Sequence, residues 1–135
     1  MTQLVLLDTD TLSAIMRGHL KAVAKGNDYL NDHGQFTFSI ITRFELLRGL
    51  KVKNATRQAV AFENLCLANI IFDLTDSIII KAADIYADLY RRGLLIGDAD
   101  ILIAATALVH GYAVATNNER HFQRIPGLHL ENWLK

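Results

Sequence analysis

Acidic and amide side chains occur at four places where the sequence predicts the end of a strand or the start of a helix. These places are LLDTDTL with Asp8 and Asp10, TRFELLRG with Glu45, IGDADILIAA with Asp98 and Asp100, and VATNNERHF with Asn117, Asn118 and Glu119. Each segment follows or borders an apolar run. Carboxylates gathered at one edge of a core repel each other unless a cation lies between them. In proteins that cation is usually a divalent metal ion.

Glu45 is the most informative of these residues. It lies four residues after Ile41 and is therefore predicted to project near the apolar side of its helix. A carboxylate in that position needs a partner. The sequence offers two, an ion pair with Arg43 or Arg48 or a bound metal ion, and it does not distinguish between them.

The paired acids at the other two helix starts have different predicted roles. Asp10 is closer to its helix than Asp8 and is predicted to be the N-cap, which frees Asp8 for another role. Asp98 and Asp100 open a helix whose dipole alone would favour two acids, by about 0.3–1 kcal/mol each. Asp100 shares a face with Ala104 and is predicted to point inward, whereas Asp98 is predicted to cap the helix or support the site from outside.

Asp8, Glu45 and Asp100, called the acid trio below, form an all-oxygen donor set suited to Mg²⁺ or Mn²⁺. Asp98 and Asn118 are further candidate ligands, although Asn118 also fits a simple turn. Ions of this kind bind phosphate oxygens and activate water, which predicts phosphodiester hydrolysis. Zinc is not expected, because the five histidines are scattered and no HxxxH motif or cysteine pair occurs.

Short apolar runs alternate with helical patterns along the chain. Strands are predicted over 4–7, 36–39, 69–74, 112–115 and 128–130, and helices over 9–15, 20–30, 42–50, 55–67, 76–92 and 98–110, with Asn54 capping the fourth helix. This alternation predicts a three-layer α/β/α fold with a four- to five-stranded, mainly parallel sheet. Ligands of such sheets bind at the carboxyl ends of the strands, where the four acidic segments are predicted to meet.

Length and composition indicate the number of domains, the net charge and the cellular compartment. The chain of 135 residues is predicted to form a single domain, 1–135, with a formal net charge of zero, so any nucleic-acid surface must be local. The lone Cys66 suits a reducing cytosol. The N-terminus does not read as a signal peptide and the apolar runs are too short for a membrane span, so a cytoplasmic protein is expected.

With these motifs identified, the sequence resembles the PIN-domain ribonucleases, and specifically the VapC-type toxins of bacterial toxin–antitoxin pairs. The resemblance runs from LLDTD to GLHLENW and is carried by LLDTD, FELLRG, IGDADILIAATA and VATNNERHFQRIPGL. It implies the α/β/α PIN fold and an endoribonuclease, dependent on Mg²⁺ or Mn²⁺, that inhibits translation by cutting tRNA or rRNA. It also implies a homodimer and a cognate VapB-type antitoxin.

By position, the acid trio matches the metal-binding acids of that family. Asp98 matches a less constant acid, and the fourth acidic or amide position falls at Asn118 or Asn117. The chain departs from the family at two places. Asp10 stands where Asn is commoner, and His121 stands where an acid often precedes Phe122, so the number of metal ions is left open.

Cationic residues near these motifs are candidates for holding RNA. They are Arg43, Arg48, Lys51, Lys53, Arg57 and Arg120, each of which also fits ordinary solvated surface. Two other functions are compatible with the sequence. One is a catalytically degenerate RNA- or protein-binding module of the same fold. The other is a phosphoacceptor domain of the receiver type using Asp73, although Asn117 stands where that design needs a lysine.

Overall fold

The computed structural model describes residues 1–135 and confirms the alternation of strands and helices. The strands are β1 (Val5–Leu7), β2 (Thr37–Ser39), β3 (Ile70–Phe72), β4 (Ala113–Ala115) and β5 (Leu130–Glu131). The helices are α1 (Thr9–Met16), α2 (Leu20–His33), α3 (Ile40–Val52), α4 (Thr56–Ala68), α5 (Asp76–Arg91), α6 (Asp98–His110) and α7 (Glu119–Phe122). All five strands are parallel, in the order β3-β2-β1-β4-β5.

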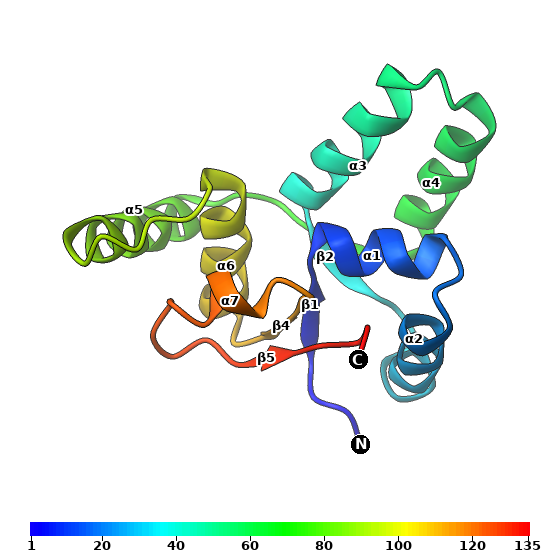
Figure 1. The fold of residues 1–135 in the computed structure, drawn as a ribbon. Coiled ribbons are helices and arrows are strands. Elements are labelled where there is room, and N and C mark those ends of the chain that lie inside the picture. The colour runs from blue at the N-terminus through cyan, green and yellow to red at the C-terminus, as the bar shows by residue number, and fades with distance from the viewer.

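Helices cover both faces of this sheet, as the three-layer prediction requires (Figure 1). Alternate residues of β1 point to opposite faces, because side chains alternate along a strand. Val5 and Leu7 join the core beneath α1, α2 and α4, whereas Leu6 joins the core beneath α5 and α6. All three are fully buried, which explains why the strand reads as an unbroken apolar run.

Helix α5 begins at the predicted cap and buries the predicted apolar face. The hydroxyl of Thr75 accepts a hydrogen bond from the Ile78 backbone N–H at 3.3 Å and caps the helix. The predicted stripe of Ile78, Ala82, Ile85 and Leu89 is buried against α6 and the sheet.

None of the helices combines the length and the apolar character that spanning a membrane requires.

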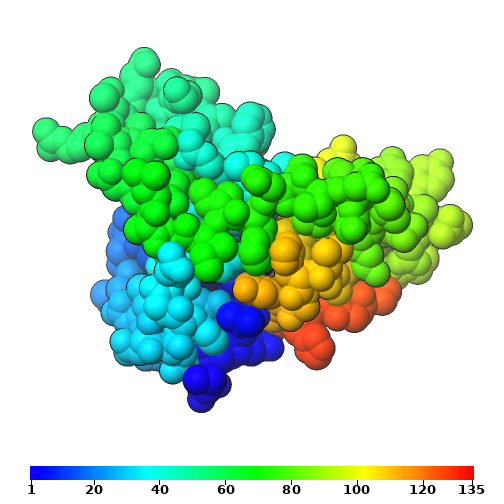
Figure 2. Space-filling model, turned by 180° about the vertical axis from the view of Figure 1, so that it is seen from behind, coloured from blue at the N-terminus to red at the C-terminus, as the bar shows by residue number.

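Helices α3 and α4 form a hairpin, called the α3–α4 arm below, that stands out from the rest of the molecule (Figures 1 and 2). The predicted cap at the tip of this arm is wrong. Asn54 has a left-handed φ of 51°, and Ala55 is the N-cap of α4 without a side-chain cap hydrogen bond. Asparagine tolerates the left-handed conformation better than most residues, so Asn54 forms the turn itself.

Candidate active site

The predicted meeting place lies at the carboxyl edge of the sheet. Asp8 directly follows β1 and Thr116 directly follows β4, and these two strands are paired. The first residues of α1, α3 and α6 are at the same edge (Figure 1). Glu45 comes from the second turn of α3 and Asp100 from the first turn of α6.

Asp8 is buried, with 4% of its surface exposed. Its Oδ1 accepts the Thr11 backbone N–H at 2.8 Å, so Asp8 is the N-cap of α1 and the prediction of Asp10 as the cap is wrong. Asp10 lies exposed in the first turn of the helix. Burial raises the pKa of Asp8 to about 6, against hydrogen bonds from Thr116 and Thr11 that lower it. An ionised Asp8 is therefore costly unless a positive charge is nearby.

Glu45 has one predicted partner, Arg48, and one that was not predicted, Thr9. Its Oε1 accepts the Thr9 hydroxyl at 2.7 Å, which ties α3 to the first residue of α1. Its Oε2 lies 3.6 Å from an Arg48 guanidinium nitrogen, so the ion-pair interpretation holds for Arg48. It fails for Arg43, whose guanidinium pairs with Glu63 at 3.0 Å. The Arg48 side chain is 59% exposed and can swing away, since exposed ion pairs are weak.

Asp100 is partly buried and lies in the field of Glu45. Burial raises the pKa of Asp100 most, the Glu45 charge raises it further, and His121 opposes the rise. Asp10 adds a smaller repulsion to both Asp8 and Asp100. These mutual effects show that the structure brings the acids of α1, α3 and α6 into one region of excess negative charge.

The chemistry of this region fits a hydrated divalent cation. No three His, Cys, Asp or Glu side chains converge closely enough to bind one ion directly. Magnesium, however, usually keeps several waters and takes only one or two carboxylates directly. A cation would also favour the ionised forms of Asp8 and Asp100, whose pKa values burial raises.

The other predicted ligands are placed differently. The prediction that Asp98 caps α6 is wrong, because Gly97 is the N-cap and Asp98 is the first residue of the helix. Asp98 is exposed and borders a 560 Å³ groove between α5 and α6. Asn117 and Glu119 both accept hydrogen bonds from Asn132 at 3.2 Å, which ties them to the C-terminal segment. Asn118 faces His121, with 2.9 Å between its Nδ2 and the ring Nδ1.

Two threonines that sequence reasoning missed support the acid trio. Thr9 holds Glu45, and Thr116 hydrogen-bonds to Asp8 while its Oγ1 accepts the Asn118 backbone N–H at 2.8 Å. Thr116 is fully buried. The available signal was position, because Thr9 directly follows Asp8 and Thr116 directly follows a buried strand.

The candidate RNA-binding cations divide into engaged and free side chains. Arg43 is held by Glu63 and Cys66, and Arg48 lies beside Glu45 and over the Phe44 ring. Lys53 is exposed and borders a 300 Å³ groove that includes Glu45.

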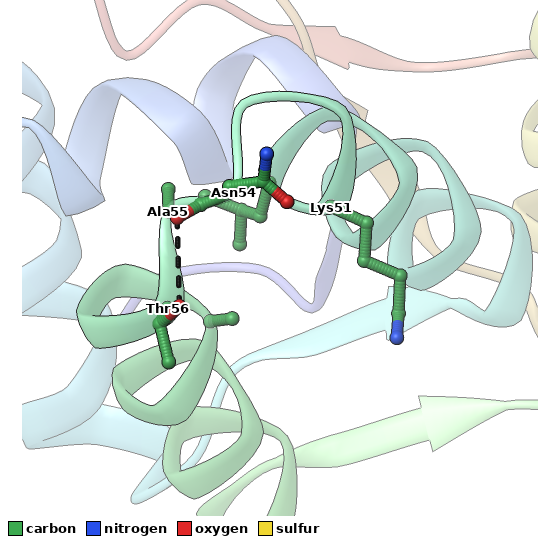
Figure 3. Close-up of a pocket in the computed structure, with 6 residues that line it drawn as sticks. Lys51, Asn54, Ala55 and Thr56 are labelled. Atoms are coloured by element: carbon green, nitrogen blue, oxygen red, sulfur yellow. Dashed lines mark hydrogen bonds between the residues drawn. The ribbon is translucent and has the colours of Figure 1, made fainter.

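Lys51 is exposed beside a 460 Å³ pocket at the tip of the α3–α4 arm, which Asn54, Ala55 and Thr56 also line (Figure 3). Arg57 and Arg120 are exposed as well. The exposed cations Lys51, Lys53 and Arg57 therefore lie on the arm, and Arg120 lies on α7.

The fold and this edge define an α/β protein with a partly buried acidic site at the carboxyl ends of parallel strands. Residues 5–128 match the sequence pattern of the PIN domain, and the chain belongs to the PIN-domain family. Membership of that family removes the receiver-type alternative, and Asp73 is simply exposed after β3.

Individual relatives make the family assignment more specific. The chain is 36% identical over 96 residues to Ribonuclease VapC1 of Methanocaldococcus jannaschii, covering 71% of this chain and 68% of the relative. It is 34% identical over 96 residues to the tRNA(fMet)-specific endonuclease VapC of Salmonella typhimurium, covering 70% and 73%. Among solved structures, a DNA-bound VapBC from Salmonella typhimurium superposes with a TM-score of 0.86 at 28% identity, covering 98% of this chain and 99% of the other.

Proposed function

We propose that this protein is a Mg²⁺-dependent endoribonuclease that acts as the toxin of a VapBC-type toxin–antitoxin pair. One observation carries the proposal: Asp8 after β1, Glu45 of α3 and Asp100 of α6 lie at the carboxyl edge of the sheet, where burial raises the pKa of Asp8, and burial and the Glu45 charge raise the pKa of Asp100, so that ionising these two acids costs free energy. Such a cost is relieved by a cation, and the VapC relatives named above are ribonucleases.

The residues of the site have separate tasks in this proposal. Asp8, Glu45 and Asp100 would hold a hydrated Mg²⁺ or Mn²⁺, partly through its waters, with Asn118 as a further oxygen donor and Asp98 acting from outside. When bound, the ion supplies charge neutralisation at the phosphate and lowers the pKa of water. Thr9 fixes the Glu45 carboxylate through its 2.7 Å hydrogen bond, and the N-cap geometry fixes Asp8.

RNA needs a positive surface beside this acidic edge. Lys53 borders the groove that contains Glu45, and Lys51 lies nearer the tip of the same α3–α4 arm. We assign both to RNA phosphates, with Arg120 on the α7 side. A structured RNA such as tRNA or rRNA suits an arm that projects from the body (Figure 2). The Salmonella relative, an endonuclease specific for tRNA(fMet), supports the choice of tRNA.

Two protein partners complete the proposal. Solved neighbours are VapBC complexes, which supports a VapB-type antitoxin as the cognate partner. A second copy of the chain is proposed to cover the apolar surface of α5, where Ile79, Ile80, Tyr86 and Tyr90 are 47%, 57%, 44% and 65% exposed. Sedimentation velocity tests this dimer as a particle of twice the 15.1 kDa chain mass.

The test of the enzymatic proposal compares two aspartates of α6. Asp100→Asn should keep the fold and lose cleavage of total RNA in Mg²⁺, because it removes a carboxylate of the trio. Asp98→Asn is the matched comparison and should lose much less activity than Asp100→Asn, since Asp98 is exposed beside α5 and acts on the ion only from outside. Normal cleavage by Asp100→Asn contradicts the assignment of the site. RNA binding by the wild type without any cleavage would instead favour the degenerate binding module.

A further inference from the structure

Phe44 is an aromatic residue at the surface that directly precedes Glu45 in α3. It is 58% exposed, whereas four of the six phenylalanines are buried and Phe72 is partly buried. A phenyl ring in water forgoes the free energy that burial of its faces would supply. An exposed ring next to a residue of the acid trio is therefore a candidate contact for whatever molecule the site binds.

The helical positions place this ring on the side of Glu45 that faces α6. Successive residues of an α-helix are about 100° apart, so Arg48 lies about 60° from Glu45 around the axis, and Phe44 lies about 100° from it in the same direction. Ile41, about 40° from Glu45 on that side, packs against the core beneath α5 and α6. Phe44 therefore lies on the side of α3 that faces α6, the helix that carries Asp100.

Arg48 connects the ring to the acidic site. Its guanidinium carbon lies over the Phe44 ring, 5.1 Å from the ring centroid, and one of its nitrogens lies 3.6 Å from Glu45 Oε2. Because the Arg48 side chain is 59% exposed, both contacts are weak and can be exchanged for contacts to a ligand. A base that displaces the guanidinium can stack on the ring, and the released Arg48 can then pair with a phosphate.

A phenyl ring at this position selects an unpaired base. In an A-form duplex each base is covered on both faces by its neighbours, so the ring can stack only on a base that has left the duplex. Stacking on an aromatic side chain accepts any of the four bases, because every base has a π face. Contacts to phosphates alone do not provide this discrimination between a single strand and a duplex.

We infer that Phe44, with Arg48 beside it, stacks on the base of an unpaired nucleotide next to the phosphate that is cut. Phe44 adjoins Glu45 in the chain, so the base that it holds belongs to a nucleotide close to the acid trio. Lys51 and Lys53 supply charge to the RNA surface, and Phe44 supplies its contact with a base. The inference rests on the proposed function, because it concerns RNA held at the same site.

Photocrosslinking of the metal-free wild type tests this contact directly. A single-stranded RNA in which every uridine is 5-iodouridine is bound in EDTA at low salt, where phosphate contacts are strongest, and is then irradiated. Iodouridine crosslinks to aromatic side chains that stack on it. Trypsin cleaves after Arg43 and Arg48, so Phe44 is the only aromatic residue of its peptide. Mass spectrometry should find RNA attached to this peptide.

Fluorescence anisotropy in EDTA measures the contribution of the ring to affinity. Phe44→Ala should weaken binding of an unstructured oligoribonucleotide by about 5- to 100-fold, with little change for a duplex of the same sequence. The slope of log affinity against log salt should stay the same, because stacking releases no counterions. Phe44→Trp should bind as tightly as the wild type, and Phe44→Leu should not. Leu67→Ala, which removes an 86% exposed apolar side chain from α4, is the control and should have no effect.

The outcomes separate this inference from the proposed function. The absence of a crosslink in the Phe44 peptide overturns the stacking role, even if the protein cleaves RNA in Mg²⁺. Equal losses of affinity for the single strand and the duplex, or wild-type affinity in Phe44→Ala or Phe44→Leu, overturn it as well. If the wild type cleaves no RNA with any divalent cation, the enzymatic function fails, and the crosslink still decides whether Phe44 stacks on a base. The crosslink is made with the wild type, so this result does not depend on the folding of a variant.

Discussion

Replacing Asp8 by Asn should make the metal-free protein more stable at neutral pH. Asp8 is 4% exposed, and burial raises its pKa from the ordinary 3.8 to about 6. Each pKa unit is equivalent to 1.36 kcal/mol, so keeping Asp8 ionised costs ~3 kcal/mol of folding free energy. Asparagine removes the charge and can still accept the Thr11 N–H, but it loses the Thr116 hydrogen bond, worth ~1 kcal/mol. The expected net gain is about 2 kcal/mol.

The raised pKa of Asp8 determines how the stability of the wild type changes with pH. Between pH 3.8 and about 6 the folded wild type binds more protons at Asp8 than the unfolded chain does. Stability therefore falls as pH rises through that window, and the full cost is present above it. The advantage of Asp8→Asn should be absent at pH 4, appear between pH 4 and 6, and stay constant above pH 6.

Urea unfolding in EDTA at pH 4 and pH 7.5 measures this difference. Asp98→Asn is the control, because losing this exposed acid from the first turn of α6 should lower stability by ~0.3–1 kcal/mol through the helix dipole and should not raise it. Adding Mg²⁺ should stabilise the wild type and not Asp8→Asn, which reduces or reverses the gain. A variant no more stable than wild type at pH 7.5, or equally stabilised at both pH values, would refute the argument from burial.

Two further predictions concern the surroundings of the trio. Thr9→Val removes the hydroxyl that donates to Glu45 at 2.7 Å, so RNA cleavage should fall at least tenfold. The free energy of unfolding, measured in urea, should change by only about 1 kcal/mol. Unchanged cleavage would show that Glu45 does not need this hydrogen bond. Replacing Lys51 and Lys53 together by Ala should weaken RNA binding and reduce the slope of log affinity against log salt by about 1–2, as measured by fluorescence anisotropy. An unchanged affinity and slope would show that neither lysine contacts RNA.

The sequence predicted the architecture because its signals are local. Unbroken apolar runs such as Val5–Leu7 read as strands buried on both faces, and the spacing of Ile78, Ala82 and Ile85 read as one helix face. Boundaries shifted by a few residues at most. The order of the strands in the sheet was not predicted, because the sequence does not show which strands are neighbours. The expectation that Asp8, Glu45 and Asp100 lie at one edge followed from a general rule, that parallel strands share a carboxyl edge.

The errors concern choices between neighbouring residues. Asp8 and Asp10 both precede a helical run, and only the extended backbone of Asp8, with φ −78° and ψ 172°, made it the cap. Asn54 was predicted to be the N-cap of α4, but it forms the left-handed turn before that helix instead. Contacts between residues distant in sequence could not be predicted either. No local pattern indicated that Glu63 would pair with Arg43 and leave Arg48 beside Glu45.

The central claim is that the acid trio holds a divalent cation with which the protein cleaves RNA. The most direct measurement is cleavage of total cellular RNA by the metal-free protein as Mg²⁺ is added back, with end mapping of the fragments. We predict no cleavage in EDTA, recovery that saturates with Mg²⁺, and cuts at a small number of defined sites. Equal cleavage with and without a divalent cation would contradict the account.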